Sequence, residues 1–135
     1  MPNMPETPER IAHAFVTAIN NHDTRELSAL MPPEHRFIDS LGGVTVGRQR
    51  MQEAWTSYFD IFPDYHIRVE ETLTDGFVVV MLGAAHGTYV KQGLLSVQNS
   101  WSMPAVWRAQ IQDGKVIEWR VYADNEPVRQ VIAKV

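Results

Sequence analysis

The stretch DGKVIEWRVYADNEPVRQV, residues 113–131, holds a turn, a strand and the start of a helix. Asp113-Gly114 is a strong turn signal between two strands. The residues after it are rich in valine, isoleucine, tryptophan and tyrosine, which suit a pleated sheet. This largely apolar strand finishes on Asp124. Asp124 is therefore either an acid–base group at the mouth of a pocket or a cap of the helix that follows.

Upstream of this stretch, from residue 65, the apolar residues follow the two-residue period of a strand. Asp75-Gly76 predicts a hairpin that leads into a long central strand at 77–90. Gly83 and Gly87 within that strand predict a bend or bulge where the sheet curves. Another long strand is predicted at 97–112, with one apolar face made of Trp101, Met103, Ala105, Trp107 and Ala109. Its Pro104 indicates an edge or a bulge, because proline has no N–H for the ladder.

The N-terminal half has the 3.6-residue period of helices. A helix is expected to begin after Thr7, its N-cap, and a second short helix after Asp23 or Thr24. A short strand follows at 35–39, and a third helix is expected at 47–62. Its broad apolar stripe consists of Met51, Ala54, Trp55, Tyr58, Phe59 and Phe62. The order predicts an α+β fold, an antiparallel sheet with helices packed on one face. We expect one domain over 7–135 and a loose N-terminus over 1–6.

The composition restricts the classes of function. The chain has 135 residues, a net charge of −4 and no cysteine. Without a basic run or stripe, nucleic acid is not expected as a partner. Without cysteine, disulfides, thiolate metal sites and thiol catalysis are excluded. The longest apolar run, 77–85, is too short to span a bilayer, so no membrane association and a cytoplasmic location are expected.

Several stretches together resemble the SnoaL-like branch of the nuclear transport factor 2-like superfamily. They are AFVTAINNHDTRELSALM (14–31), FIDSLGGVTVGRQRMQEAW (37–55), FPDY (62–65), HGTYV (86–90) and the opening stretch. The resemblance implies a curved sheet wrapped around the N-terminal helices as a cone with an apolar pocket, and a homodimer formed through the sheet. It is closest to SnoaL-like polyketide cyclases and more distant to ketosteroid isomerase and limonene epoxide hydrolase. The fold serves several enzyme classes and non-catalytic binding domains.

The resemblance implies three candidate catalytic residues. Asp124 corresponds to the carboxylate that serves as general acid/base in the last strand of SnoaL-like cyclases. Asp39, in FIDSLGG, resembles the proton-shuttling aspartate of ketosteroid isomerase, although it also suits an Asx turn. His86 would be an orienting partner or proton shuttle, or else a hydrogen-bonded sheet residue. If the three side chains do not converge on one cavity, the enzyme hypothesis loses its basis.

The chain also departs from its catalytic relatives. Phe15 stands where ketosteroid isomerase has a tyrosine, and no carboxylic acid lies near Val106. The region VKQGLL, 90–95, lacks the arginine–aspartate pair of the epoxide hydrolases. These departures favour the alternative hypothesis, a non-catalytic ligand-binding or dimerisation domain.

The leading prediction is a pocket for a small hydrophobic molecule, with a cofactor-independent cyclase, isomerase or lyase activity based on an aspartate. Aromatic residues are abundant, and pockets of this kind are mostly apolar. No pair of histidines has the sequence spacing of a metal site, so no metal is expected. The predicted ligand-binding residues are Phe15, Trp55, Phe59, Tyr89, Trp101, Trp107, Trp119 and Tyr122.

Overall fold

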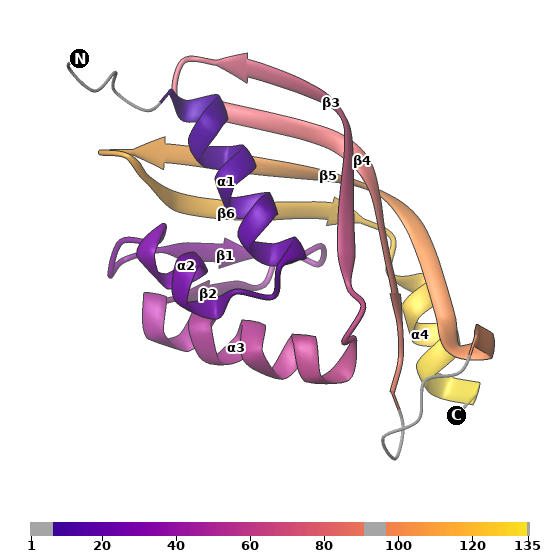
Figure 1. Cartoon of the computed structure of the whole chain (residues 1–135). Coiled ribbons are helices and arrows are strands. Elements are labelled where there is room, and N and C mark those ends of the chain that lie inside the picture. The colour runs from indigo at the N-terminus through magenta and orange to yellow at the C-terminus, as the bar shows by residue number, and fades with distance from the viewer. Residues whose placement is uncertain (1–6, 91–96, 135) are drawn as a thin grey trace.

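An open, curved sheet with helices across one of its faces forms the fold (Figure 1). The computed structural model describes residues 7–90 and 97–134. The segment 1–6, predicted to be loose, and most of the VKQGLL segment lie outside the described residues. The elements are α1 (Pro8–Asn20), α2 (Thr24–Ala29), β1 (Arg36–Ile38), β2 (Val44–Val46), α3 (Arg48–Ile61), β3 (His66–Asp75), β4 (Val78–Thr88), a 3-10 turn η1 (Val97–Asn99), β5 (Ser100–Gln112), β6 (Lys115–Ala123) and α4 (Glu126–Lys134).

The described strands form one six-stranded sheet in the order β2-β1-β6-β5-β4-β3. The predicted α+β class is confirmed, with one difference in the sheet. β1 pairs with β6 in parallel, whereas the other neighbours are antiparallel. A hairpin fixes antiparallel pairing only between consecutive strands. Because most of the chain lies between β1 and β6, local turn signals could not reveal their relative direction.

The predicted helix caps and the predicted bend of the sheet are both present in the structure. Thr7 accepts a hydrogen bond from the Arg10 backbone N–H at the start of α1, and Asp23 caps α2. The register of β3 against β4 shifts between Val69 and Glu71, opposite Gly83. A Cβ atom on Gly83 would overlap the carbonyl oxygen of Arg68. The glycine therefore allows the two backbones to approach at the bulge where the sheet bends.

Pro104 lies where β5 has a sheet neighbour on one side. It is paired with Ala84 of β4, whereas the pairing with β6 begins one residue later, at Ala105. The prediction of a local edge at this proline is therefore confirmed. Because Pro104 has no partner on β6 within the described sheet, its missing N–H removes no hydrogen bond from the pairing of β5 with β6.

The core lies between the helices and the inner face of the sheet. Along β5 the odd-numbered residues from Trp101 to Ile111 are buried, while their neighbours are half-buried or exposed. This is the face that the sequence predicted for the strand. α1 contributes a buried stripe on the same side, including Phe15 and Ile19. The ring of Phe15 lies 4.6 Å from that of Trp119 on β6, so the first helix and the last strand are in direct contact.

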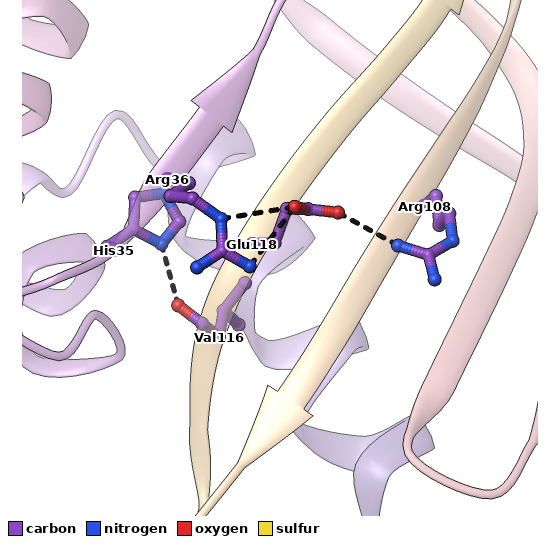
Figure 2. A network of polar contacts seen from close by, with 5 residues as sticks. All are labelled: His35, Arg36, Arg108, Val116 and Glu118. Atoms are coloured by element: carbon purple, nitrogen blue, oxygen red, sulfur yellow. Dashed lines mark hydrogen bonds and ion pairs between the residues drawn. The ribbon is translucent and has the colours of Figure 1, made fainter. Parts of the chain in front are cut away.

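The outer face of the sheet carries an ion-pair network across three strands (Figure 2). Glu118 on β6 accepts hydrogen bonds from Arg36 on β1, through Oε1, and from Arg108 on β5, through Oε2 at 2.8 Å. Its side chain is 12% exposed, so these bonds compensate a largely buried carboxylate. The network thereby joins β1 to the rest of the sheet.

Among the helices of the described residues, none has the length and apolar character needed to cross a membrane.

Candidate functional site

A cavity of about 240 Å³ lies between α3 and the inner face of the sheet. Its walls come from α3, from β1, β5 and β6, and from the segments that follow β1, α3 and β6. The lining residues are Phe37, Asp39, Ser40, Met51, Ala54, Trp55, Tyr58, Tyr65, Met103, Trp107, Trp119, Val121 and Asn125. The lining is thus largely apolar and aromatic, with a few polar groups, which is typical of small-molecule sites.

Contacting rings hold the α3 side of the cavity in place. Trp55 stacks on Phe59 at a centroid distance of 5.5 Å, and its edge meets Tyr58 at 6.1 Å. Tyr58 in turn meets Tyr65 edge-on at 4.9 Å. Phe59 also stacks on His22, whose ring bonds the backbone carbonyl of Tyr65. These contacts link α3 to the turn after α1 and to the residue that precedes β3, so neighbouring segments support the aromatic wall.

Two of the tryptophans that line the cavity have hydrogen-bond donors without an acceptor in the described part of the chain. The indole Nε1 atoms of Trp55 and Trp119 are buried and have no acceptor among the described residues. Burial raises the pKa of Tyr58, and burial together with the nearby Tyr58 raises the pKa of Tyr65. Both phenols therefore stay neutral at physiological pH and can donate. The wall is suited to an uncharged molecule with an acceptor oxygen.

Asp39, Ser40 and Asn125 supply the polar part of the lining. The carboxylate atom Oδ1 of Asp39 accepts hydrogen bonds from the backbone N–H groups of Leu41 and Gly43, both at 2.9 Å. Its other oxygen, Oδ2, makes no hydrogen bond within the described residues. Asn125 donates to the Ser40 hydroxyl at 2.6 Å. The Asx turn predicted for Asp39 is present, and the same residue lies in the cavity wall.

Asp124 lies outside this cavity. Its carboxylate accepts a hydrogen bond from the backbone N–H of Glu126 at 2.9 Å and pairs with Arg129 at 3.5 Å. The side chain is 81% exposed. The sequence left Asp124 as either an acid–base group or a helix cap. Its observed contacts are those of a helix cap, because the carboxylate accepts from a free backbone N–H at the start of α4. The neighbouring residue, Asn125, is the one that lines the cavity.

His86 lies on the outer face of β4, where its side chain is exposed. It borders a second, open cleft together with Asp64, Gly87, Thr88, Ser100, Trp101 and Ser102. Asp64 accepts two hydrogen bonds from Thr88, one from the backbone N–H and one from the hydroxyl, each at 2.7 Å. The three predicted catalytic side chains therefore do not converge, and the enzyme hypothesis that combined them loses its basis. Asp39 is the member of the set that lines the inner cavity.

The predicted ligand-binding residues divide into two groups. Trp55, Trp107 and Trp119 line the inner cavity. The other five lie elsewhere: Phe15 and Phe59 are buried in the core, Tyr89 is half-buried beside Phe62, Trp101 borders the outer cleft, and Tyr122 is exposed on the outer face with Arg120 over its ring.

Sequence reasoning missed several lining residues, notably Tyr58, Tyr65, Met103, Ser40 and Asn125. Tyr58 was assigned to the apolar stripe of the third helix, and Met103 to the buried face of its strand. Both assignments were available from periodicity, but periodicity does not distinguish a core position from a cavity wall. Asn125 had a weaker signal, its place next to Asp124 at the end of the last strand.

Comparisons with known proteins agree on the fold. The model of the SnoaL-like domain family matches residues 12–119. A candidate SnoaL-like polyketide cyclase from Shewanella denitrificans has a similar structure, with a TM-score of 0.82, 16% identity, and coverage of 95% of this chain and 98% of that one. IdmH, a candidate polyketide cyclase from Streptomyces antibioticus, has a TM-score of 0.78 and 19% identity, with coverage of 95% of this chain and 99% of that one. A nuclear transport factor 2-like protein from Burkholderia thailandensis has a TM-score of 0.79 and 17% identity, with coverage of 94% of this chain and 98% of that one. No curated protein matches the chain.

Proposed function

Because this chain belongs to the SnoaL-like domain family, we propose that it binds a small, uncharged, mainly apolar molecule in the cavity beneath α3 and transfers a proton within it. The unpaired indole N–H groups of Trp55 and Trp119 carry the proposal. A buried donor without an acceptor costs about 1–3 kcal/mol. A ligand carbonyl or ether oxygen would recover that free energy, which gives the cavity a preference for acceptor-bearing molecules.

The size of the cavity restricts the ligand. Its volume of about 240 Å³ falls just below the usual range of ligand pockets, roughly 300–1,000 Å³. A molecule of one or two rings is therefore the expected occupant. Two of the similar structures are named as candidate polyketide cyclases. We carry this to the present chain as a proposal: the substrate is a carbonyl compound with acidic C–H groups next to the carbonyl.

Asp39 is the proposed general base. Its location in the cavity wall and its unoccupied Oδ2 support this role, while the backbone N–H groups on Oδ1 fix the orientation of the carboxylate. The base would take a proton from the carbon next to a substrate carbonyl. The resulting enolate oxygen would accept from the buried indole or phenol donors. In a cyclisation, the enolate carbon would attack a second carbonyl, and the alkoxide formed would take the proton back from Asp39. In an isomerisation, an unsaturated ketone would give a dienolate, and Asp39 would return the proton to its γ-carbon.

The binding step can be tested with a matched pair of compounds. 1-Tetralone carries one ketone oxygen on two fused rings, and tetralin has the same rings without an acceptor. We expect 1-tetralone to bind more tightly, measured by quenching of tryptophan fluorescence and by calorimetry. Trp55→Phe and Trp119→Phe should reduce that preference several-fold while tetralin binding changes little, because each removes a donor and keeps an aromatic wall. Equal affinity of the wild type for both compounds would refute the donor-based site.

The proton-transfer step can be tested with 2-tetralone in D₂O, by following exchange of its C1 protons in NMR spectra. Asp39→Asn is expected to slow the exchange at least about 100-fold, in line with general-base contributions, and to leave ligand binding nearly intact. Asp124→Asn tests the other carboxylate. A large loss in Asp124→Asn with normal exchange in Asp39→Asn would reverse the assignment of the base.

A non-catalytic ligand-binding role is the second candidate. The separation of Asp39, Asp124 and His86 favours it, because no second acid–base side chain lies beside Asp39 in the described cavity lining. This alternative predicts 1-tetralone binding without any enzyme-dependent exchange of 2-tetralone protons. The same two experiments therefore distinguish the two functions.

We also propose a homodimer formed through the outer face of the sheet, in the cytoplasm. Half-exposed apolar residues on that face, such as Val106, and the exposed ring of Tyr122 support it. Light scattering coupled to size-exclusion chromatography would test the assembly. A monomer mass at micromolar concentration would contradict it.

A further inference from the structure

We propose that His66 and His86 form a binding site for a divalent transition-metal ion on the outer face of the sheet, separate from the cavity. The two residues are directly opposite each other in the antiparallel register of β3 and β4. Both side chains are exposed, and their ring centroids lie 5.4 Å apart with an interplanar angle of 37°. Sequence spacing could not indicate this pair, because strand pairing across a hairpin brings the two histidines together.

Neither ring nitrogen of His66 or His86 is hydrogen-bonded within the described residues, whereas each of the other three histidines has one bonded ring nitrogen. His13 bonds the Thr72 hydroxyl, His22 bonds the Tyr65 carbonyl, and His35 bonds the Val116 carbonyl. His66 and His86 make no hydrogen bond within the described residues, so each retains a nitrogen lone pair for a ligand. Imidazole nitrogen is a preferred donor for zinc, copper and nickel.

The separation of the rings fits a shared metal ion. With Zn–N distances of about 2.0–2.1 Å and a ring radius of roughly 1.1 Å, two imidazoles in tetrahedral arrangement have centroids about 5 Å apart. The observed 5.4 Å is close to this separation, so rotation of the two exposed side chains can bring their ring nitrogens to one ion without movement of the strands. A much longer separation would have required movement of the sheet backbone.

The surroundings of the pair set the expected strength of binding. His86 is opposite Ser102 on β5, and the open cleft beside it also includes Asp64. No group of three or more histidine or carboxylate side chains able to hold a metal exists among the described residues. The ion is therefore expected to have two protein ligands and to keep water in its remaining positions. Copper should bind more tightly than nickel or zinc, and magnesium should not bind.

Calorimetry at constant pH would test the site, with zinc, nickel and magnesium chlorides added to the purified full chain. We expect zinc and nickel to bind with one-to-one stoichiometry. His66→Ala and His86→Ala should each weaken binding at least about tenfold. His13→Gln is the matched control, because it removes an imidazole on α1 and leaves this pair unchanged. Long-range ¹H–¹⁵N spectra should show shifts of the ring nitrogens of His66 and His86 upon addition of zinc.

A second readout guards against variants that fold poorly. A metal that joins β3 to β4 stabilises the folded state, so zinc should raise the Tm of the wild type and of His13→Gln, but not that of either pair variant. Unchanged zinc affinity in the double variant His66→Ala/His86→Ala would overturn the proposal. An equal loss in His13→Gln, or ring-nitrogen shifts confined to the other histidines, would overturn it as well.

Discussion

Trp119 illustrates how one side chain serves both the core and the cavity. It is fully buried, contacts Phe15 of α1 and lines the pocket, yet its indole N–H has no acceptor in the described chain. Phe15 cannot provide one, whereas a tyrosine hydroxyl at this position could accept as well as donate. The proposed ligand would therefore supply the acceptor for this indole N–H.

His35 is a second buried polar residue with a physical consequence. It is fully buried, and its Nδ1 donates to the Val116 carbonyl at 2.6 Å (Figure 2). Its Nε2 has no partner in the described part of the chain. Burial lowers the pKa of His35 from its ordinary value of 6.5, more than the Val116 hydrogen bond raises it. The folded protein therefore holds this imidazole in its neutral form.

This shift predicts a pH-dependent stability. Below pH 6.5 the unfolded chain binds a proton at His35 that the folded chain resists. The free energy of unfolding should thus be highest above pH 6.5 and fall as the pH drops, until the lowered folded-state pKa is reached. The slope from this group is at most about 1.4 kcal/mol per pH unit. Urea denaturation between pH 7.5 and 5 should give a shallower slope for His35→Gln, and identical slopes would contradict the prediction.

At the scale of elements, the bend of the sheet depends on the pairing of β3 with β4. The bulge between Val69 and Glu71 lies opposite Gly83, and the backbone of Arg68 occupies the space of a Cβ atom there. Gly87 has a related role, because a Cβ atom would lie 2.9 Å from the Trp101 ring. Both glycines therefore allow close packing on the concave side, which lets the strands curve around the helices.

Gly83→Ala should consequently destabilise the protein. The new methyl group would overlap the backbone of Arg68, which cannot move aside as a flexible side chain would. We expect the free energy of unfolding to fall by about 1–3 kcal/mol, measured by urea denaturation. The control is Ala84→Ser. Ala84 is the next residue and is half-buried on the outer face, so this substitution should change the free energy of unfolding by less than about 0.5 kcal/mol. Equal effects of the two substitutions would show that the close approach is unimportant.

At the scale of the whole molecule, the cavity exists because α3 and the curved sheet do not fill the space between them. α3 provides Met51, Ala54, Trp55 and Tyr58, and the sheet provides Trp107 and Trp119. Ala54 is exposed although it lines the cavity, so it lies at the opening. Asp39, in the segment after β1, is also exposed and lines the cavity, so the opening lies between that segment and α3.

Ala54→Phe should close this opening. An exposed helical position tolerates the larger side chain, so the Tm should change little, whereas 1-tetralone binding should weaken at least about tenfold. Glu53→Phe is the matched control, because Glu53 is exposed on the same helix and does not line the cavity. Fluorescence quenching measures both variants. If Ala54→Phe binds as the wild type does, the ligand enters elsewhere or binds at another site.

The sequence by itself determined the α+β class, the helix caps at Thr7 and Asp23, the buried face of β5 and the bend at Gly83. These features follow from local periodicity, turn chemistry and backbone conformation, which neighbouring residues specify. Only the tertiary structure decided that β1 runs parallel to β6 and that Asp39, rather than Asp124, lines the cavity. It also decided that His66 faces His86. The strand pairings depend on contacts between residues far apart in the chain. The position of Asp39 and Asp124 depends on the side to which the end of each strand turns. Local sequence patterns encode neither of these two kinds of information.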